Sequence, residues 1–165
     1  MEFKEEFENL NVDEFKKKYF KMLSPYFNEI FWDYFKKVKF WKENEQNGVF
    51  YYEVVIDERC ANPLQIVHGG ALATLIENLA TSSLFYFSNV RYKTLDISIN
   101  YKNQVPLNKM MQIWVNCQKV GSNTSFVEVQ VKGKDEGVCT QASIIKSKVN
   151  SSKNKDIKNA MKSKF

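Results

Sequence analysis

The sequence predicts an α+β domain in which one long central helix is wrapped by a curved antiparallel β-sheet. Residues 71–87 are apolar on nearly every side, which is typical of a helix buried all round. The segments that follow alternate between apolar and polar residues, which is typical of strands. A chain of 165 residues has the length of one domain. One helix and one sheet account for these elements with none left over.

Three regions are expected along the chain. Residues 1–36 are predicted to form an N-terminal helical extension, because their apolar residues follow helical spacing and Ser24-Pro25 suits a helix restart. The aromatic face of this extension suits packing on the main domain, a mobile lid over a pocket, or a membrane-surface helix. Residues 37–148 are predicted to form the main domain. Residues 149–165 are rich in Lys, Asn and Ser, which predicts a disordered tail.

The main domain is expected to begin with a β-hairpin over residues 38–56, whose turn lies at 44–48. A loop containing Asn62-Pro63 leads into the helix. Further strands are predicted at 110–120, 125–133 and 138–147. The strand at 94–101 alternates strictly, which places Leu95, Ile97, Ile99 and Tyr101 on one face and Thr94, Asp96, Ser98 and Asn100 on the other.

Composition narrows the function classes. The net charge of +5 arises from 24 basic and 19 acidic residues, and nearly all the basic residues are lysines interleaved with acids. Bidentate Arg contacts dominate readout of DNA bases, so we expect no nucleic-acid partner. One histidine and three cysteines without C-x-x-C spacing predict neither a metal site nor a disulfide scaffold. The N-terminus lacks a signal-like apolar run, and residues 69–90 are too polar for stable membrane insertion. A cytoplasmic location is therefore the default expectation, and an organelle is the alternative left open.

Glu77 is the sole formal charge between residues 69 and 90. A buried charge is costly, so Glu77 must reach a cleft, find a partner or stay protonated. Burial raises the pKa of a carboxyl group, which would suit Glu77 to general-base work near neutral pH. The plainer alternatives are a position at the water boundary or an ion pair between subunits. Thr81 lies one helical turn further on, so we expect its hydroxyl on the same face.

His68-Gly69-Gly70 stands where the helix is expected to begin. The first N–H groups of a helix have no partner within it and carry partial positive charge. Two glycines let a ligand approach this backbone closely, so the turn can hold a developing oxyanion. The alternative is that glycine only permits tight packing at the helix entry.

Taken together, these residues form a pattern. Asn62, followed six residues later by His68-Gly69-Gly70-Ala71-Leu72-Ala73-Thr74-Leu75-Ile76-Glu77, resembles the signature of hotdog-fold acyl-CoA thioesterases of the phenylacetate-pathway and thioesterase-superfamily-member type. The resemblance spans roughly residues 37–147. It implies the hotdog fold and hydrolysis of an acyl-CoA thioester to free acid and coenzyme A. It also implies a homodimer, paired further into a dimer of dimers, with active sites across the subunit interface.

The resemblance assigns roles to six residues. It implies that the Gly69 N–H polarises the thioester carbonyl, that Asn62 places water or substrate, and that Glu77 of the other subunit is general base or nucleophile. By the same resemblance Thr94 holds water, Thr81 assists the glutamate and His68 is structural or orienting. No cofactor is expected, since coenzyme A is part of the substrate. Candidate phosphate contacts are Lys102, Lys119, Lys132 and Arg91, and the residues that either line an acyl channel or form core are Leu84, Phe85, Tyr86 and Phe87.

Two other interpretations stay open. The first is a hotdog module that binds an acyl-CoA or other acyl ligand without turnover. A pure binder has no need of a carboxylate in the helix, so the set Asn62, Gly69 and Glu77 favours an enzyme. The second is a cysteine hydrolase that uses Cys60 and His68, for which no third orienting residue is apparent.

Overall fold

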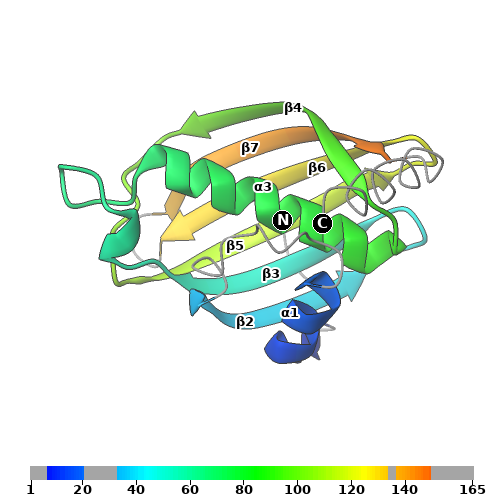
Figure 1. The fold of residues 1–165 in the computed structure, drawn as a ribbon, viewed down its shortest axis with the longest axis horizontal. Helices are drawn as coiled ribbons and strands as arrows, with labels where there is room; N and C mark the ends of the chain where they lie inside the picture. The colour runs from blue at the N-terminus through cyan, green and yellow to red at the C-terminus, as the bar shows by residue number, and fades with distance from the viewer. Residues whose placement is uncertain (1–6, 21–32, 134–136, 150–165) are drawn as a thin grey trace, which may run out of the picture.

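The computed structural model describes residues 7–20, 33–133 and 137–149. These residues form a seven-stranded antiparallel sheet in the order β1-β2-β3-β5-β6-β7-β4, and the long helix α3 lies across its concave face (Figure 1). The strands are β1 Glu8–Leu10, β2 Phe35–Lys42, β3 Gly48–Val55, β4 Tyr92–Tyr101, β5 Met110–Val120, β6 Thr124–Gly133 and β7 Gly137–Lys148. The helices are α1 Val12–Phe20, the 3-10 turn Glu58–Cys60 and α3 Gly69–Ser88. The predicted helix wrapped by a curved antiparallel sheet is confirmed.

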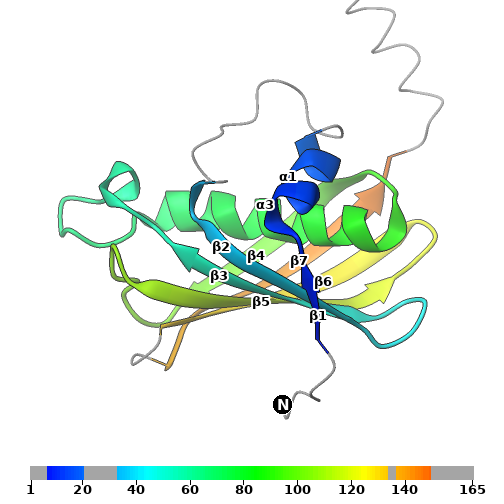
Figure 2. The ribbon, with the colours of Figure 1, turned by 90° about the horizontal axis from the view of Figure 1, so that it is seen from below.

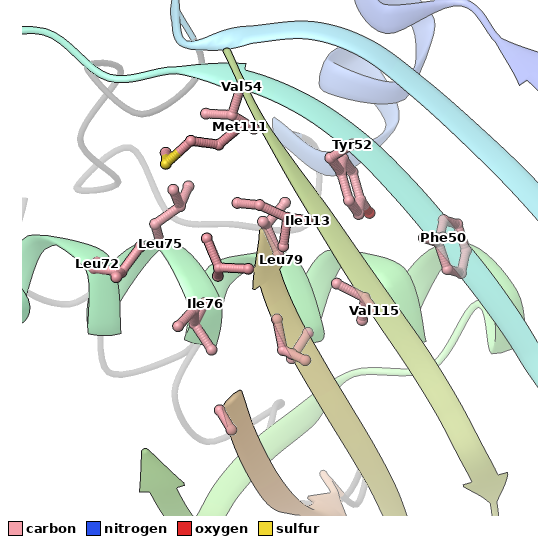
Figure 3. Packing of buried hydrophobic residues seen from close by; sticks show 14 of the residues in the cluster. Phe50, Tyr52, Val54, Leu72, Leu75, Ile76, Leu79, Met111, Ile113 and Val115 are labelled. Carbon is pink, nitrogen blue, oxygen red and sulfur yellow. The ribbon is translucent and has the colours of Figure 1, made fainter. Parts of the chain in front are cut away.

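The core lies between α3 and the inner face of the sheet. Ten of the 20 residues of α3 are buried, and only Gly70 and Thr74 are exposed. Each fully buried aliphatic side chain contributes about 1.5–3 kcal/mol relative to an exposed one, so this interface is the main source of stability. Figure 3 shows the side chains that meet here, which are Phe50, Tyr52, Val54, Leu72, Leu75, Ile76, Leu79, Met111, Ile113 and Val115.

A β-bulge at Leu95 overturns the predicted strict alternation of β4. Thr94 pairs with Lys146, whereas Asp96 pairs with Ile145. Consecutive residues of β7 point to opposite faces of the sheet, so Thr94 and Asp96 do so as well. The strict alternation predicted from the sequence would put these two residues on the same face. The extra residue, Leu95, rotates Thr94 to the face that carries α3.

The N-terminal extension is only partly helical. α1 is a helix, capped by Asn11, whose Oδ1 accepts hydrogen bonds from the N–H groups of Asp13 and Glu14. Residues 8–10, predicted as helix, instead form β1, which pairs antiparallel with β2. The Ser24-Pro25 restart and nearly all of the predicted tail lie outside the described residues. Phe15 of α1 is buried in the core, so this part of the extension packs on the domain.

β4 forms one edge of the sheet. Although β4 comes between β3 and β5 in the chain, it pairs with neither of them. β4 pairs with β7, and β3 pairs directly with β5. Figure 2 shows α1 and α3 on the same side of the sheet. Three large apolar side chains of β4 are exposed, namely Leu95, Ile97 and Tyr101. Among the described residues, no helix has the length and apolarity needed to cross a membrane.

Candidate active site

The start of α3 is built by His68 and the two glycines after it. His68 is the N-cap residue, and its Nδ1 accepts a hydrogen bond of 2.9 Å from the Gly70 N–H. Its own N–H donates to the Cys60 carbonyl oxygen at 2.8 Å, which ties the preceding loop to the helix. The Gly69 N–H has no acceptor among the described residues. The structure therefore places His68 as a cap and leaves the Gly69 N–H available to a ligand.

A cavity of about 780 Å³ opens beside this helix start. Tyr101 closes one side of it, because its hydroxyl donates a 2.8 Å hydrogen bond to the Gly69 carbonyl oxygen. Tyr101 is not among the site residues predicted from the sequence. The cavity is lined by Asn62, Ile66, Val67, Gly69, Leu72, Tyr101, Lys102, Asn103, Gln104 and Val105.

Asn62 lines the cavity and also shapes the loop that borders it. Its Oδ1 accepts hydrogen bonds from the N–H groups of Leu64 at 2.9 Å and Ile66 at 3.3 Å. Its own N–H donates to the Ile66 carbonyl oxygen at 2.9 Å. This turn holds the loop in place after Pro63. Asn62 and Gly69, which the sequence pattern linked, are thus brought to one cavity.

Glu77 lies further along α3, within a hydrogen-bonded cluster from three elements. Its Oε1 accepts hydrogen bonds from Thr94 of β4 at 2.7 Å, Lys146 of β7 at 2.7 Å and Thr81 of α3 at 3.1 Å. The Lys146 ammonium also donates to both threonine hydroxyls. The structure thus places Thr81 beside Glu77, as the helical spacing predicted, and adds Thr94 and Lys146. The Thr94 hydroxyl is already engaged with two protein groups.

Lys146 reverses the expected charge behaviour of Glu77. Burial acts to raise the pKa of the Glu77 carboxyl group, as the sequence analysis assumed. The Lys146 charge and the hydrogen bonds from Lys146, Thr94 and Thr81 outweigh that effect, so the pKa lies below its ordinary value of 4.5. The expectation of a raised pKa is therefore wrong. Glu77 is an ionised carboxylate throughout the physiological range.

Sequence reasoning missed Lys146 for a physical reason. It lies 69 residues beyond Glu77 and belongs to a Lys-rich C-terminal stretch that resembles solvated surface. One feature of the sequence could have revealed Lys146, namely its position in the strand pattern of β7. Ala142 and Ile144 alternate toward the core, and Lys146 is the next residue on that face. A lysine at an inward position demands an acid opposite it. Glu77 is the only acid of α3.

The other candidates fall in different places. Lys102 lines the cavity, whereas Lys132 lies over the Trp114 ring at 6.0 Å, and Lys119 and Arg91 are not among the lining residues. Leu84 is part of the core, and the three aromatic residues after it pack against that core at the far end of α3.

The structure does not assemble the cysteine-hydrolase pair. The Cys60 Sγ is buried and contacts the Tyr34 hydroxyl at 3.4 Å, while the ring of His68 engages Gly70. Within the described residues, no three His, Cys, Asp or Glu side chains are grouped to hold a metal ion.

Comparison with known proteins finds one family whose model matches part of this chain. Residues 64–140 match the model of the thioesterase superfamily. This part of the chain is therefore similar to thioesterase-superfamily domains. The matched range includes Gly69, Glu77, Thr81 and Thr94, and it ends before Lys146.

Individual relatives are more distant. The rat acyl-coenzyme A thioesterase THEM4 is 33% identical over 70 residues, which are 42% of this chain and 30% of that protein. The crystal structure of zebrafish thioesterase superfamily member 2 matches with a TM-score of 0.65 at 22% identity, covering 84% of this chain and 98% of that chain. The Streptococcus mutans protein smu.793, bound to acetyl CoA, matches with a TM-score of 0.60 at 18% identity, covering 78% and 94%. These structural matches establish that the domain has the hotdog fold.

The lowered pKa of Glu77 predicts how stability depends on pH. A carboxyl group whose folded-state pKa is depressed stabilises the fold above its ordinary pKa, and this contribution is lost as the pH falls through the folded-state value. The advantage of the wild type over Glu77→Gln in the free energy of unfolding should therefore shrink below pH 4.5. Urea unfolding from neutral pH to about pH 3 measures this. Glu128→Gln, the same change at an exposed residue of β6, is the control. If the difference in the free energy of unfolding between the wild type and Glu77→Gln stayed constant with pH, the lowered pKa of Glu77 would be contradicted.

Proposed function

We propose that this domain hydrolyses an acyl-CoA thioester to a free carboxylic acid and coenzyme A, in sites shared between two subunits. One observation carries the proposal: an ionised glutamate and an unpaired backbone N–H lie on the same buried helix, and the N–H opens into a cavity of about 780 Å³. An N–H at a helix start stabilises the oxyanion formed when a thioester carbonyl is attacked. A carboxylate supplies the base or nucleophile that such a reaction needs.

The spacing along α3 supports a site made by two chains. Gly69 and Glu77 are eight residues apart, which is about 12 Å along a helix at ~1.5 Å per residue. A carbonyl carbon and its oxygen are only about 1.2 Å apart. This spacing favours a site to which one chain supplies the N–H and another supplies the carboxylate. In a two-fold dimer, Gly69 of one subunit meets Glu77 of the other, and two equivalent sites result.

The β4 edge supports the dimer. Among the described residues, no strand pairs with the outer side of β4, which leaves a row of backbone N–H and C=O groups there, and such an edge favours pairing with another chain. The exposed Leu95, Ile97 and Tyr101 add apolar area to this edge. A second copy of β4 would continue the sheet and bring the two α3 helices close. A pair of such dimers would form the dimer of dimers.

The cavity supports a coenzyme A ester as the substrate class. Lys102 lies in its lining, where the ammonium offers a point charge to a phosphate group. Asn62, Asn103 and Gln104 add polar contacts, and Val67 and Leu72 add an apolar wall. The rat relative is an acyl-coenzyme A thioesterase, and the Streptococcus mutans protein of the same fold is bound to acetyl CoA.

The reaction balances with water as the only co-substrate. The oxygen of water ends on the acyl carbon, either directly with Glu77 as general base or after Glu77 has formed an acyl anhydride that water then opens. The carbon–sulfur bond breaks, and the proton removed from water ends on the coenzyme A thiolate. In both routes the Gly69 N–H stabilises the oxyanion.

The first test of the proposal is thiol release from short, medium, long and aromatic acyl-CoAs. We expect the wild type to turn over at least one class, and Glu77→Gln to lower kcat by about 10²- to 10⁴-fold, as for loss of a general base. Glu128→Gln should retain wild-type activity, since Glu128 lies away from the site. Acyl-CoA binding without any thiol release from the wild type would contradict the enzyme and favour the binding module.

The second test separates a shared site from a site within one chain. Gly69→Pro removes the N–H at the first helical position, where proline is tolerated, and His68 already has the extended ψ of 129° that precedes proline. Gly69→Ala keeps the N–H, and its Cβ would meet Tyr101 at an ordinary 3.6 Å. We expect Gly69→Pro to lose most of kcat and Gly69→Ala to retain it.

Mixing the two defective chains gives the decisive result. In a heterodimer of Gly69→Pro and Glu77→Gln subunits, one shared site has both intact groups and the other has neither. After unfolding, mixing in equal amounts and refolding, about a quarter of wild-type activity should return, because half of the dimers are mixed and each has one working site. A mixture as inactive as its parents would show that each site lies within one chain.

A further inference from the structure

The least expected side chain of the core is a lysine. Lys146 on β7 is fully buried, with 0% of its side chain exposed. The other large side chains buried to the same degree are aliphatic or aromatic. An unpaired ammonium in such a place costs several kcal/mol, so its retention requires complete hydrogen bonding.

The hydrogen bonds assign the charge of Lys146. An ammonium group has three N–H donors, and Lys146 has three acceptors in range: Glu77 Oε1, Thr81 Oγ1 and Thr94 Oγ1. Each threonine hydroxyl places its own hydrogen on Glu77, Thr94 on Oε1 and Thr81 on Oε1 and the backbone carbonyl. The hydroxyls therefore act only as acceptors toward Lys146. A neutral amine has two N–H groups and would leave one acceptor unmet, so the network requires the ammonium form.

The same network distinguishes the two oxygens of Glu77. Oε1 accepts from Lys146, Thr94 and Thr81, which uses its acceptor capacity. Oε2 has no partner among the described residues, and 37% of the Glu77 side chain is exposed. We propose that Lys146 is a positioning residue for the hydrolysis proposed above: it clamps Glu77 through Oε1, keeps it ionised and presents Oε2 to the substrate. This inference rests on the proposed function for its catalytic meaning.

Within the described residues, Lys146 is the one charged group that acts on Glu77. Of the other elements packed against α3, β4 contributes the neutral Thr94. The inward residues of β5 and β6 are apolar except for two. These are Ser125, an uncharged residue of β6 that pairs with Lys146, and the Cys117 thiol, whose pKa burial raises to about 12. Tyr52 of β3 is neutral for the same reason. The acids at the N-terminal end, Glu8 and Glu14, act on Tyr86, about 13 Å further along α3.

The test replaces Lys146 with residues that lack its charge. Lys146→Met removes both charge and hydrogen bonds, and Lys146→Gln retains an N–H donor in case the first variant does not fold. Lys148→Met makes the same charge change at an exposed residue of β7 and is the matched control. The readouts are the pH profile of kcat/KM and a ¹³C NMR titration of the Glu77 carboxyl carbon, assigned by its absence from Glu77→Gln.

In the wild type and Lys148→Met we expect Glu77 to titrate below 4.5. In both Lys146 variants burial is no longer opposed by a charge, so the titration and the acid limb of kcat/KM should move upward by about 1–3 pH units. At pH values above the acid limb Glu77 is ionised in the variants as well. Any loss of kcat that remains there measures how well the Glu77 carboxylate is positioned. There Lys146→Met should lower kcat on the order of 10- to 100-fold while KM stays near the wild-type value, since Lys146 does not touch the substrate.

The outcomes separate this inference from the proposed function. A Glu77 titration that is unmoved in folded Lys146 variants would overturn the inference, and so would a kcat loss without any shift of the acid limb. If the wild type hydrolyses no acyl-CoA while the titration moves as expected, the proposed function fails and the control of the Glu77 charge by Lys146 stands.

Discussion

The ion pair between Glu77 and Lys146 is the constraint around which the domain is arranged. A helix buried on most sides by a curved sheet is stable because it is apolar, and a charge inside that layer is tolerated only with a matching charge and a full set of hydrogen bonds. The network meets this demand for the ammonium of Lys146 by joining α3, β4 and β7. The bulge at Leu95 has its reason here, because it turns Thr94 inward to complete the set.

α3 also fixes the distance between the two functional groups of the proposed site. Its first turn offers an N–H of partial positive charge, and two turns later it offers a carboxylate. Under the proposed function these two groups are complementary halves of an acyl-transfer site, and two chains are needed to complete it. The open β4 edge and the exposed apolar residues on it have a common explanation in a second copy of the chain. The proposed dimer would thus account for the open edge of the sheet and for the position of the site together.

The sequence was most informative where local periodicity decides structure. The buried helix, the hairpin and the last three strands follow from patterns of period 3.6 and 2, and Thr81 followed Glu77 because one helical turn separates them. Features set by long-range contacts were not predictable in the same way. β1 forms because β2 offers it an edge to pair with, and Thr94 faces inward because of a bulge in β4. The pKa of Glu77 is lowered by Lys146, which is distant in the sequence but adjacent in the folded chain. Tyr101 likewise reaches Gly69 only in the folded chain.

A double-mutant cycle on the free energy of unfolding tests the central claim most directly. Wild type, Glu77→Gln, Lys146→Met and the double variant would be unfolded in urea at neutral pH. Each single change strands one partner, so the double variant should be more stable than the two single losses added together imply. We expect a coupling of about 1–3 kcal/mol, below that of fully buried pairs because 37% of the Glu77 side chain is exposed. Additive losses, with no coupling, would contradict the account.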